Sequence, residues 1–269
     1  MLNISLSAFS LYYISKIELN ASVIYPIAVT WIGIFAAILF FIVLGKLLNW
    51  KYSVIGALIM CAGFSNTSFV GIPVIQALYG EKGLKTLMLV DQPGFVALST
   101  VGILVSNFYS GSKDSVTKHL VKVIKFPPFI AFAIALLLNI FSIEIPKDLD
   151  DVFMKLGATT VPLALVSVGS QMQWKKIEKQ DGFHLFIGLF FKLIIYPLII
   201  LVIYKFILNQ SGEMIDICIM EAAMAPMITA AIIASAHNLD PKLCNLMVAV
   251  GIPVSFISLA FWHYILHFI

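Results

Sequence analysis

The sequence is poor in charge and contains no arginine. Only 12% of its 269 residues are charged and 61% are hydrophobic, and the mean hydropathy is +1.01. Soluble domains carry roughly 25% charged residues, so a soluble enzyme and a nucleic-acid-binding protein are excluded. All 17 basic residues are lysines, which removes bidentate guanidinium recognition of a carboxylate or phosphate.

Cysteine and catalytic motifs are scarce as well. The three cysteines, Cys61, Cys218 and Cys244, lie in apolar stretches, so neither a disulfide framework nor a metal motif is predicted. His263 and His267 have the spacing of a metal-binding pair, but no third ligand is near, and interfacial histidines are the simpler interpretation. No catalytic or nucleotide-binding motif occurs, so we expect neither an enzyme nor a cofactor.

Apolar runs fill most of the chain. A bilayer span needs about 20 apolar residues, so an all-α polytopic protein of the cell membrane is predicted. Lys16 ends the first run early, and this run is interpreted as the remnant of a span in a chain that lacks its first transmembrane helix. The predicted spans are 2–15, 23–47, 52–79, 86–108, 126–142, 152–172, 183–207, 214–236 and 243–267.

Lysine placement predicts the orientation and the division of the chain. Ten loop lysines fall on one side of the membrane and six on the other. The positive-inside rule then places the loops 109–125 and 173–182 in the cytoplasm and the C-terminus outside. We expect one transporter domain over 1–269, with an incomplete first repeat at 1–108, the cytoplasmic loop 109–125 and a second repeat at 126–269.

An internal repeat supports this division. The stretch 58–75 aligns with 218–235, so that Asn66 falls opposite Pro226, and five spans separate the two copies. An odd number of crossings inverts the second copy, as in many secondary transporters. Paired interruptions in the two halves point to a substrate site, whereas packing kinks are the alternative interpretation. The predicted helix breaks are at Gly63, Gly71, Pro73 and Pro226.

Three motifs resemble the auxin efflux carrier family of membrane transporters, including its bacterial members. The stretch 63–73, GFSNTSFVGIP, is similar to the family signature N-T-x-x-x-G-x-P, and the stretches 156–165 and 222–240 resemble later family segments. The resemblance implies inverted five-helix repeats with two broken crossing helices, an architecture similar to that of bile-acid symporters and antiporters. It also implies a substrate cavity near the crossing. Ser65 stands where some plant members have proline, so auxin is not assumed as the substrate.

Four polar residues are candidates for substrate contact. Asn66, an uncharged side chain with two donors, stands at a predicted break, and the resemblance places the substrate-contacting asparagine of the family there. The alternative for Asn66 is a side chain that only caps the broken helix. Ser65, Thr67 and Thr229 are supporting candidates, with packing or backbone bonding as their alternative roles. A helix N-terminus exposed by a break carries partial positive charge, which suits a carboxylate.

Three ionisable residues are predicted inside spans, where charge is costly and is a functional hypothesis. Asp91, Lys192 and Glu221 are candidates for ion coupling or for an internal ion pair. A carboxylate at such a position can take up a proton in each cycle. The alternatives are an interfacial position for Asp91 and purely structural pairing for Lys192 and Glu221.

The sequence thus predicts a secondary transporter of the efflux-carrier type that moves small organic anions by alternating access, with proton coupling as one option. The alternatives are a sodium-coupled bile-acid-type symporter, a cation–proton antiporter, and, from another class, a channel or a truncated protein that does not transport. The expected partners are a small organic anion and the lipid bilayer, with a second copy in a homodimer as an option. Nucleic acid is not expected.

Overall fold

In the computed structural model, residues 2–17, 20–112, 115–171 and 179–269 are described, and every regular element within them is a helix. The all-α class and the membrane character expected from the sequence are confirmed. The α-helices are α1 (Leu2–Ile14), α2 (Ile24–Leu47), α3 (Tyr52–Gly63), α4 (Ile72–Ala97), α5 (Ile103–Ser110), α6 (Val116–Ile124), α7 (Pro127–Ile140), α8 (Lys147–Ala158), α9 (Thr160–Gln171), α10 (Lys179–Phe190), α11 (Tyr196–Leu201), α12 (Glu213–Ala222), α13 (Ile228–Ala236) and α14 (Pro241–Leu266).

Several of these helices join into longer rods through short π-helical turns. Within the described residues, four continuous stretches are long and apolar enough to cross a membrane, namely Ala21–Leu47, Thr67–Ser110, Gly182–Ile207 and Pro241–Leu266. The second of these bends sharply at Gly80, whose φ of 67° suits glycine. The joining turns are η2 (Thr67–Gly71), η3 (Leu98–Gly102), η4 (Phe191–Ile195) and η5 (Val202–Ile207), and the 3₁₀ turn η1 (Ala21–Val23) precedes α2.

The structure differs from the predicted spans where helices are interrupted. The spans predicted at 52–79 and 214–236 each stop and resume, between Gly63 and Thr67 and between Ala222 and Ile228. The span predicted at 152–172 is divided at Thr159, and its helix begins earlier, at Lys147, because two aspartates in the first turn favour a helix N-terminus.

The connection between the two halves also differs from the prediction. The stretch predicted as a cytoplasmic loop, 109–125, contains the helix α6. Lys118 and Lys122 are exposed on it, one helical turn apart, and Val121 lies between them. Most of the loop predicted at 173–182 lies outside the described residues.

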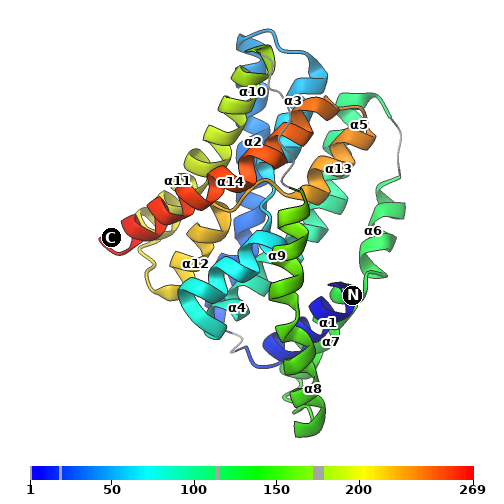
Figure 1. The fold of residues 1–269 in the computed structure, drawn as a ribbon, viewed down its shortest axis with the longest axis vertical. Coiled ribbons are helices and arrows are strands. Elements are labelled where there is room, and N and C mark those ends of the chain that lie inside the picture. Colours follow the sequence, from blue (N-terminus) through cyan, green and yellow to red (C-terminus); the bar gives the residue numbers. More distant parts are fainter. Residues whose placement is uncertain (1, 18–19, 113–114, 172–178) are drawn as a thin grey trace.

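The bundle is organised around the two interrupted helices. In Figure 1, the chain links between α3 and α4 and between α12 and α13 lie in the middle of the molecule, whereas α1, α7 and α8 gather at one end. Long helices, α2 and α14, pack on α3 and α12 respectively. The large core consists mainly of residues from α2, α3, α4, α12 and α14.

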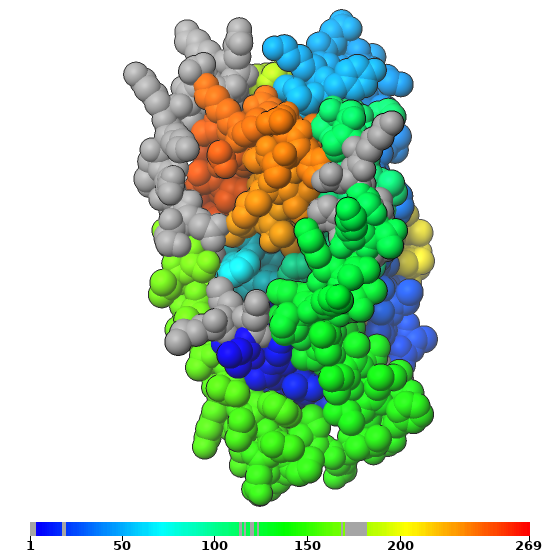
Figure 2. Space-filling view, turned by 90° about the vertical axis from the view of Figure 1, so that its right-hand side faces the viewer, coloured from blue at the N-terminus to red at the C-terminus, as the bar shows by residue number. Residues whose placement is uncertain are grey.

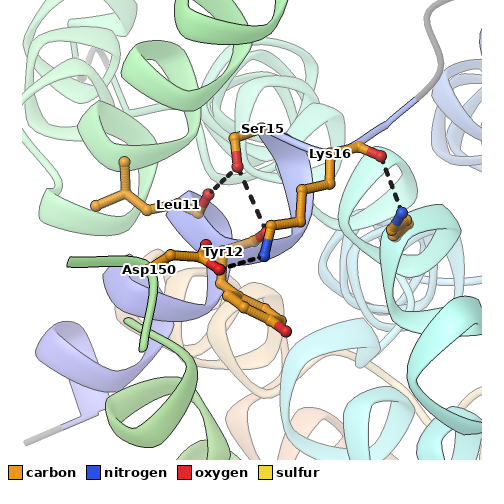
Figure 3. A network of polar contacts seen from close by, with 6 residues as sticks. Leu11, Tyr12, Ser15, Lys16 and Asp150 are labelled. Carbon is orange, nitrogen blue, oxygen red and sulfur yellow. Dashed lines mark hydrogen bonds and ion pairs between the residues drawn. The ribbon is translucent and has the colours of Figure 1, made fainter. Parts of the chain in front are cut away.

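The end of α1 is fixed by polar contacts rather than by apolar packing alone (Figure 3). Asn139 on α7 donates to three carbonyl oxygens at the end of α1, over distances of 2.7–3.1 Å. Lys16 pairs with Asp150 of α8 at 2.7 Å and lies 3.5 Å from the centroid of the Tyr12 ring. The Nζ of Lys85 donates to the Lys16 carbonyl at 2.9 Å, which joins this cluster to α4.

Candidate functional site

The two helix breaks meet and complete each other's backbone hydrogen bonds. The amide of Asn66 donates to the carbonyl of Ala225 at 2.9 Å, and the amide of Met227 donates to the carbonyl of Phe64 at 3.2 Å. This is a short antiparallel bridge between two segments that are far apart in the sequence. Backbone groups that leave a helix inside a membrane need such partners. The bridge therefore supplies hydrogen bonds that the two interrupted helices do not form internally. We refer to the bridged segments 64–66 and 225–227 as the crossing.

Small residues allow the close approach at the crossing. A Cβ atom added at Gly63 would lie 2.7 Å from the Cδ1 of Ile34, and one added at Gly251 would lie 2.6 Å from the Cδ of Pro226. Pro226 itself has no amide hydrogen to continue the helix. Pro73 lies in the first turn of α4, where proline is tolerated. Gly251 was not singled out from the sequence.

Asn66 caps the helix that follows the first break and keeps part of its side chain unpaired. The side chain is 2% exposed, and its Oδ1 caps the next helix by accepting from the Phe69 amide at 3.2 Å. Its carbonyl accepts from the amides of Val70 and Gly71. Its Nδ2 has no hydrogen-bond partner among the described residues. Because capping uses only the oxygen, two N–H donors stay available at the crossing.

The other three candidates for substrate contact are used differently. Ser65 lies opposite Pro226 in the bridge, and its hydroxyl is bound by Lys192. Thr67 donates to the Oδ1 of Asp91. Thr229 is half-buried in the first turn of α13. The structure therefore brings all four residues to the two breaks, with Thr67 turned to the buried carboxylate.

Lys192 connects the two breaks directly. It is completely buried and lies in the π-helical turn η4, a type of turn that often marks functional positions. Its Nζ donates to the Oγ of Ser65 at 2.6 Å and to the carbonyl of Ala222 at 2.7 Å. It also lies 4.4 Å from the centroid of the Tyr196 ring. Its hydrogen bonds in the structure go to these neutral oxygens.

Asp91 is buried inside the protein. It is 2% exposed, and its Oδ1 accepts from the hydroxyls of Thr67 and Ser68. Its Oδ2 accepts from the Nε2 of Gln92 at 3.0 Å. Reasoning from the sequence missed Ser68 and Gln92 as partners, although an amide next to a carboxylate in an apolar run is a signal that could have identified Gln92.

Glu221 has a different environment. It lies in the last turn of α12 and is completely buried. Neither carboxylate oxygen has a hydrogen-bond partner in the described part of the chain. The carboxylate lies against Gly71, where an added Cβ atom would be 2.9 Å from Oε1 and 3.0 Å from Oε2. Because Gly71 has no side chain, the carboxylate of Glu221 can lie directly against its backbone.

Two helix N-termini add positive potential at the crossing. The rod that begins at Thr67 and the helix α13 both start at a break, and a helix N-terminus carries roughly half a positive charge. Figure 2 shows the cyan surface that follows the first break between the orange α13 above and the dark blue α1 below, on one face of the molecule. The chain that follows the first break therefore reaches this face, whereas Asn66 itself is buried.

The histidine pair lies away from the crossing. The rings of His263 and His267 are 4.9 Å apart, and the Tyr79 ring lies 5.8 Å from that of His263. Among the residues described, no group of three or more His, Cys, Asp or Glu is arranged to hold a metal ion. The pair therefore belongs to another part of the bundle, beside Tyr79 of α4.

Comparison with known proteins identifies the family. Residues 14–263 match the membrane transport protein family. An uncharacterized transporter of Methanocaldococcus jannaschii is 26% identical over 245 residues, which cover 90% of this chain and 78% of that protein. The uncharacterized transporter YfdV of Escherichia coli is 23% identical over 211 residues, covering 77% of this chain and 66% of that protein. The chain therefore belongs to the membrane transport protein family, that of the auxin efflux carriers.

Proposed function

We propose that this chain is a secondary transporter that moves small organic anions across the cell membrane by alternating access, and that the anion binds at the crossing. The observation that carries this proposal is the buried Asn66 amide, which has no partner for its Nδ2 among the described residues. Unpartnered buried donors are costly. A ligand oxygen would satisfy this one.

The chemistry of the crossing favours a carboxylate. The ligand would face the amide of Asn66 and the N-terminal ends of two half-helices, which together attract negative charge without arginine. Lys192 lies behind Ser65 at 2.6 Å and adds a positive charge at short range. Hydrogen bonds from such groups to an ionised oxygen are stronger than bonds between neutral groups.

The order of the helices supports an inverted-repeat architecture. The long helix α2 precedes the interrupted pair α3 and α4, and the rod α10–η5 precedes the interrupted pair α12 and α13. In the first half the chain continues from α4 past the bend at Gly80 to Ser110, and in the second half the long helix α14 follows the pair. In our proposal the first repeat covers 1–108 and the second 126–269, joined by 109–125, and alternating access moves the crossing relative to α1 and α7–α9.

The test is uptake by proteoliposomes. Radiolabelled mono- and dicarboxylates are offered to the wild type, to Asn66→Ala and to the control Asn245→Ala, which changes an exposed asparagine on α14. A hydrogen bond to a charged group is worth about 1.5–3 kcal/mol, so we expect Asn66→Ala to raise KM about 10- to 100-fold. The control should match the wild type.

The alternatives give distinct outcomes in the same assay. Uptake that requires sodium would favour a sodium-coupled symporter, and exchange of cations for protons without anion uptake would favour an antiporter. Single-channel currents in planar bilayers would favour a channel. If no anion of the panel is taken up by the wild type, the proposed function is wrong.

A further inference from the structure

The buried charges at the crossing do not balance. Asp91 and Glu221 are acidic, and Lys192 is basic; all three are buried. If all three are ionised, the described crossing holds one negative charge in excess. An unbalanced charge inside a membrane protein is costly and is normally neutralised by a bound ion or proton.

The hydrogen bonds identify the carboxylate that lacks compensation. Asp91 accepts from Thr67, Ser68 and Gln92, which is the environment that stabilises an ionised carboxylate. Glu221 accepts no hydrogen bond from any described residue and is completely buried. A buried charge without donors is strongly disfavoured. The missing positive charge therefore belongs at Glu221.

The surroundings of Glu221 suit a proton better than a metal ion. Both oxygens lie within about 3 Å of the position that a Cβ atom of Gly71 would occupy, so one side of the carboxylate faces a backbone carbon. A hard metal ion needs several oxygen ligands, and no cluster of three or more acidic, histidine or cysteine residues occurs among the residues described. A proton needs only the carboxylate.

We propose that Glu221 is the residue that binds and releases the proton coupled to transport. In this step the carboxylate takes up one proton to become a neutral carboxylic acid when the crossing faces one side of the membrane, and returns it to water on the other side. The inference rests on the proposed function for its role in the transport cycle, while proton binding by Glu221 is a property of the protein alone.

Four other titratable groups face or influence this carboxylate. Asp91 of α4 and Cys218 of α12 interact with it electrostatically, as do Lys192 of η4 and Tyr196 of α11. Lys192 is held by Ser65 and Ala222, and Asp91 by three donors. Glu221 is the group of this set whose charge has no hydrogen bond to stabilise it among the described residues.

The first test is spectroscopic and needs no substrate. Infrared difference spectra of the full chain in lipid, recorded during a pH titration, are expected to show the carbonyl-stretch band of a buried carboxylic acid that disappears as the pH rises. The band should be absent from Glu221→Gln and present in Asp91→Asn and in the control Glu213→Gln, an exposed residue on the same helix. Glu221→Asp should shift the band and serves if the glutamine variant does not fold.

The outcomes separate this inference from the proposed function. A wild type without a titrating band, or a band that persists in Glu221→Gln, would overturn the inference even if anions are transported. A second arm measures uptake of the best carboxylate of the panel with and without a pH gradient, which should stimulate the wild type and Glu213→Gln but not Glu221→Gln. Equal stimulation of all three would also overturn it. Failure of the wild type to transport, with the band intact, would refute only the proposed function.

Discussion

Two lysines of this molecule both contact a tyrosine ring, but one is partly exposed and the other is buried. Lys16 and Lys192 each lie over the ring of a tyrosine four residues away, at 3.5 and 4.4 Å. Lys16 is 39% exposed and pairs with the carboxylate of Asp150. Lys192 is completely buried and donates to a hydroxyl and a carbonyl. At the periphery, Lys16 helps to fix α1 through an exposed ion pair. At the crossing, the ammonium of Lys192 is buried and its hydrogen bonds go to neutral oxygens.

The contribution of a lysine ammonium to stability depends on whether it is exposed or buried. An exposed ion pair contributes about 1 kcal/mol or less, because water screens it. A buried ammonium has no water to replace its partners, so each hydrogen bond at the crossing has a large effect.

The largest effect is expected for Lys192→Met. The substitution leaves the hydroxyl of Ser65 and the carbonyl of Ala222 without their donor, each at a cost of about 1–3 kcal/mol, and it removes the positive charge nearest to the proposed anion site. We expect uptake to fall below detection in proteoliposomes. Wild-type uptake by this variant would show that the ammonium at the crossing is dispensable.

A nearly equal effect on uptake is expected for Asn66→Asp. The aspartate keeps an oxygen to cap the Phe69 amide but replaces the free amide donors with negative charge. We expect uptake of carboxylates to fall by about 100-fold or more, and the melting temperature to fall as well, because a buried carboxylate with few donors is costly. Wild-type uptake by this variant would show that the two amide donors are not needed for substrate binding.

A smaller effect, on stability, is expected for Gly251→Ala. The added methyl group would lie 2.6 Å from the Cδ of Pro226, whose ring cannot move aside, and such overpacking costs about 1–3 kcal/mol. Gly169→Ala on α9 is the matched control, because nothing lies within 4 Å of the new Cβ atom. Thermal melts in detergent should separate the two variants. Equal melting temperatures would contradict the close packing at the crossing.

The smallest effect is expected for Lys16→Met. It removes the ion pair with Asp150 and the contact with the Tyr12 ring, and we expect a loss of about 1 kcal/mol or less that shrinks further at high salt. Thermal melts at low and high ionic strength measure this. A loss as large as that in Lys192→Met would show that the periphery and the crossing do not differ in the way the geometry indicates.

The sequence predicted most of the helices and two of the four break positions, Gly63 and Pro226. Gly71 and Pro73 were also predicted as breaks, but they lie within the continuous stretch Thr67–Ser110, which bends at Gly80 instead. Apolar runs predict the helices because membrane spans need long uninterrupted hydrophobic stretches, and Gly63 and Pro226 mark the interruptions because their backbone chemistry disfavours a helix. The sequence did not predict α6, because lysines such as Lys118 and Lys122 are typical of a loop. Their spacing of four residues also fits one face of a helix, which is what the structure shows.

The partners of the buried charges were beyond sequence reasoning. An ion pair between Lys192 and a carboxylate was one expectation, but the π-helical turn η4 directs its ammonium to Ser65 and Ala222. That choice depends on helix register and on the meeting of two distant breaks. The unsatisfied state of Glu221 likewise depends on its packing against Gly71, which no local pattern encodes.

The bridge between the breaks has a consequence for the assembly of the protein in the membrane. The carbonyl of Phe64 and the amide of Asn66 are paired with the amide of Met227 and the carbonyl of Ala225, which are synthesised much later. Until the second interrupted helix is inserted, the first carries open hydrogen-bonding groups, and these are unfavourable in lipid. The centre of the bundle is therefore expected to be the last region to fold, so biogenesis proceeds from the long outer helices inward.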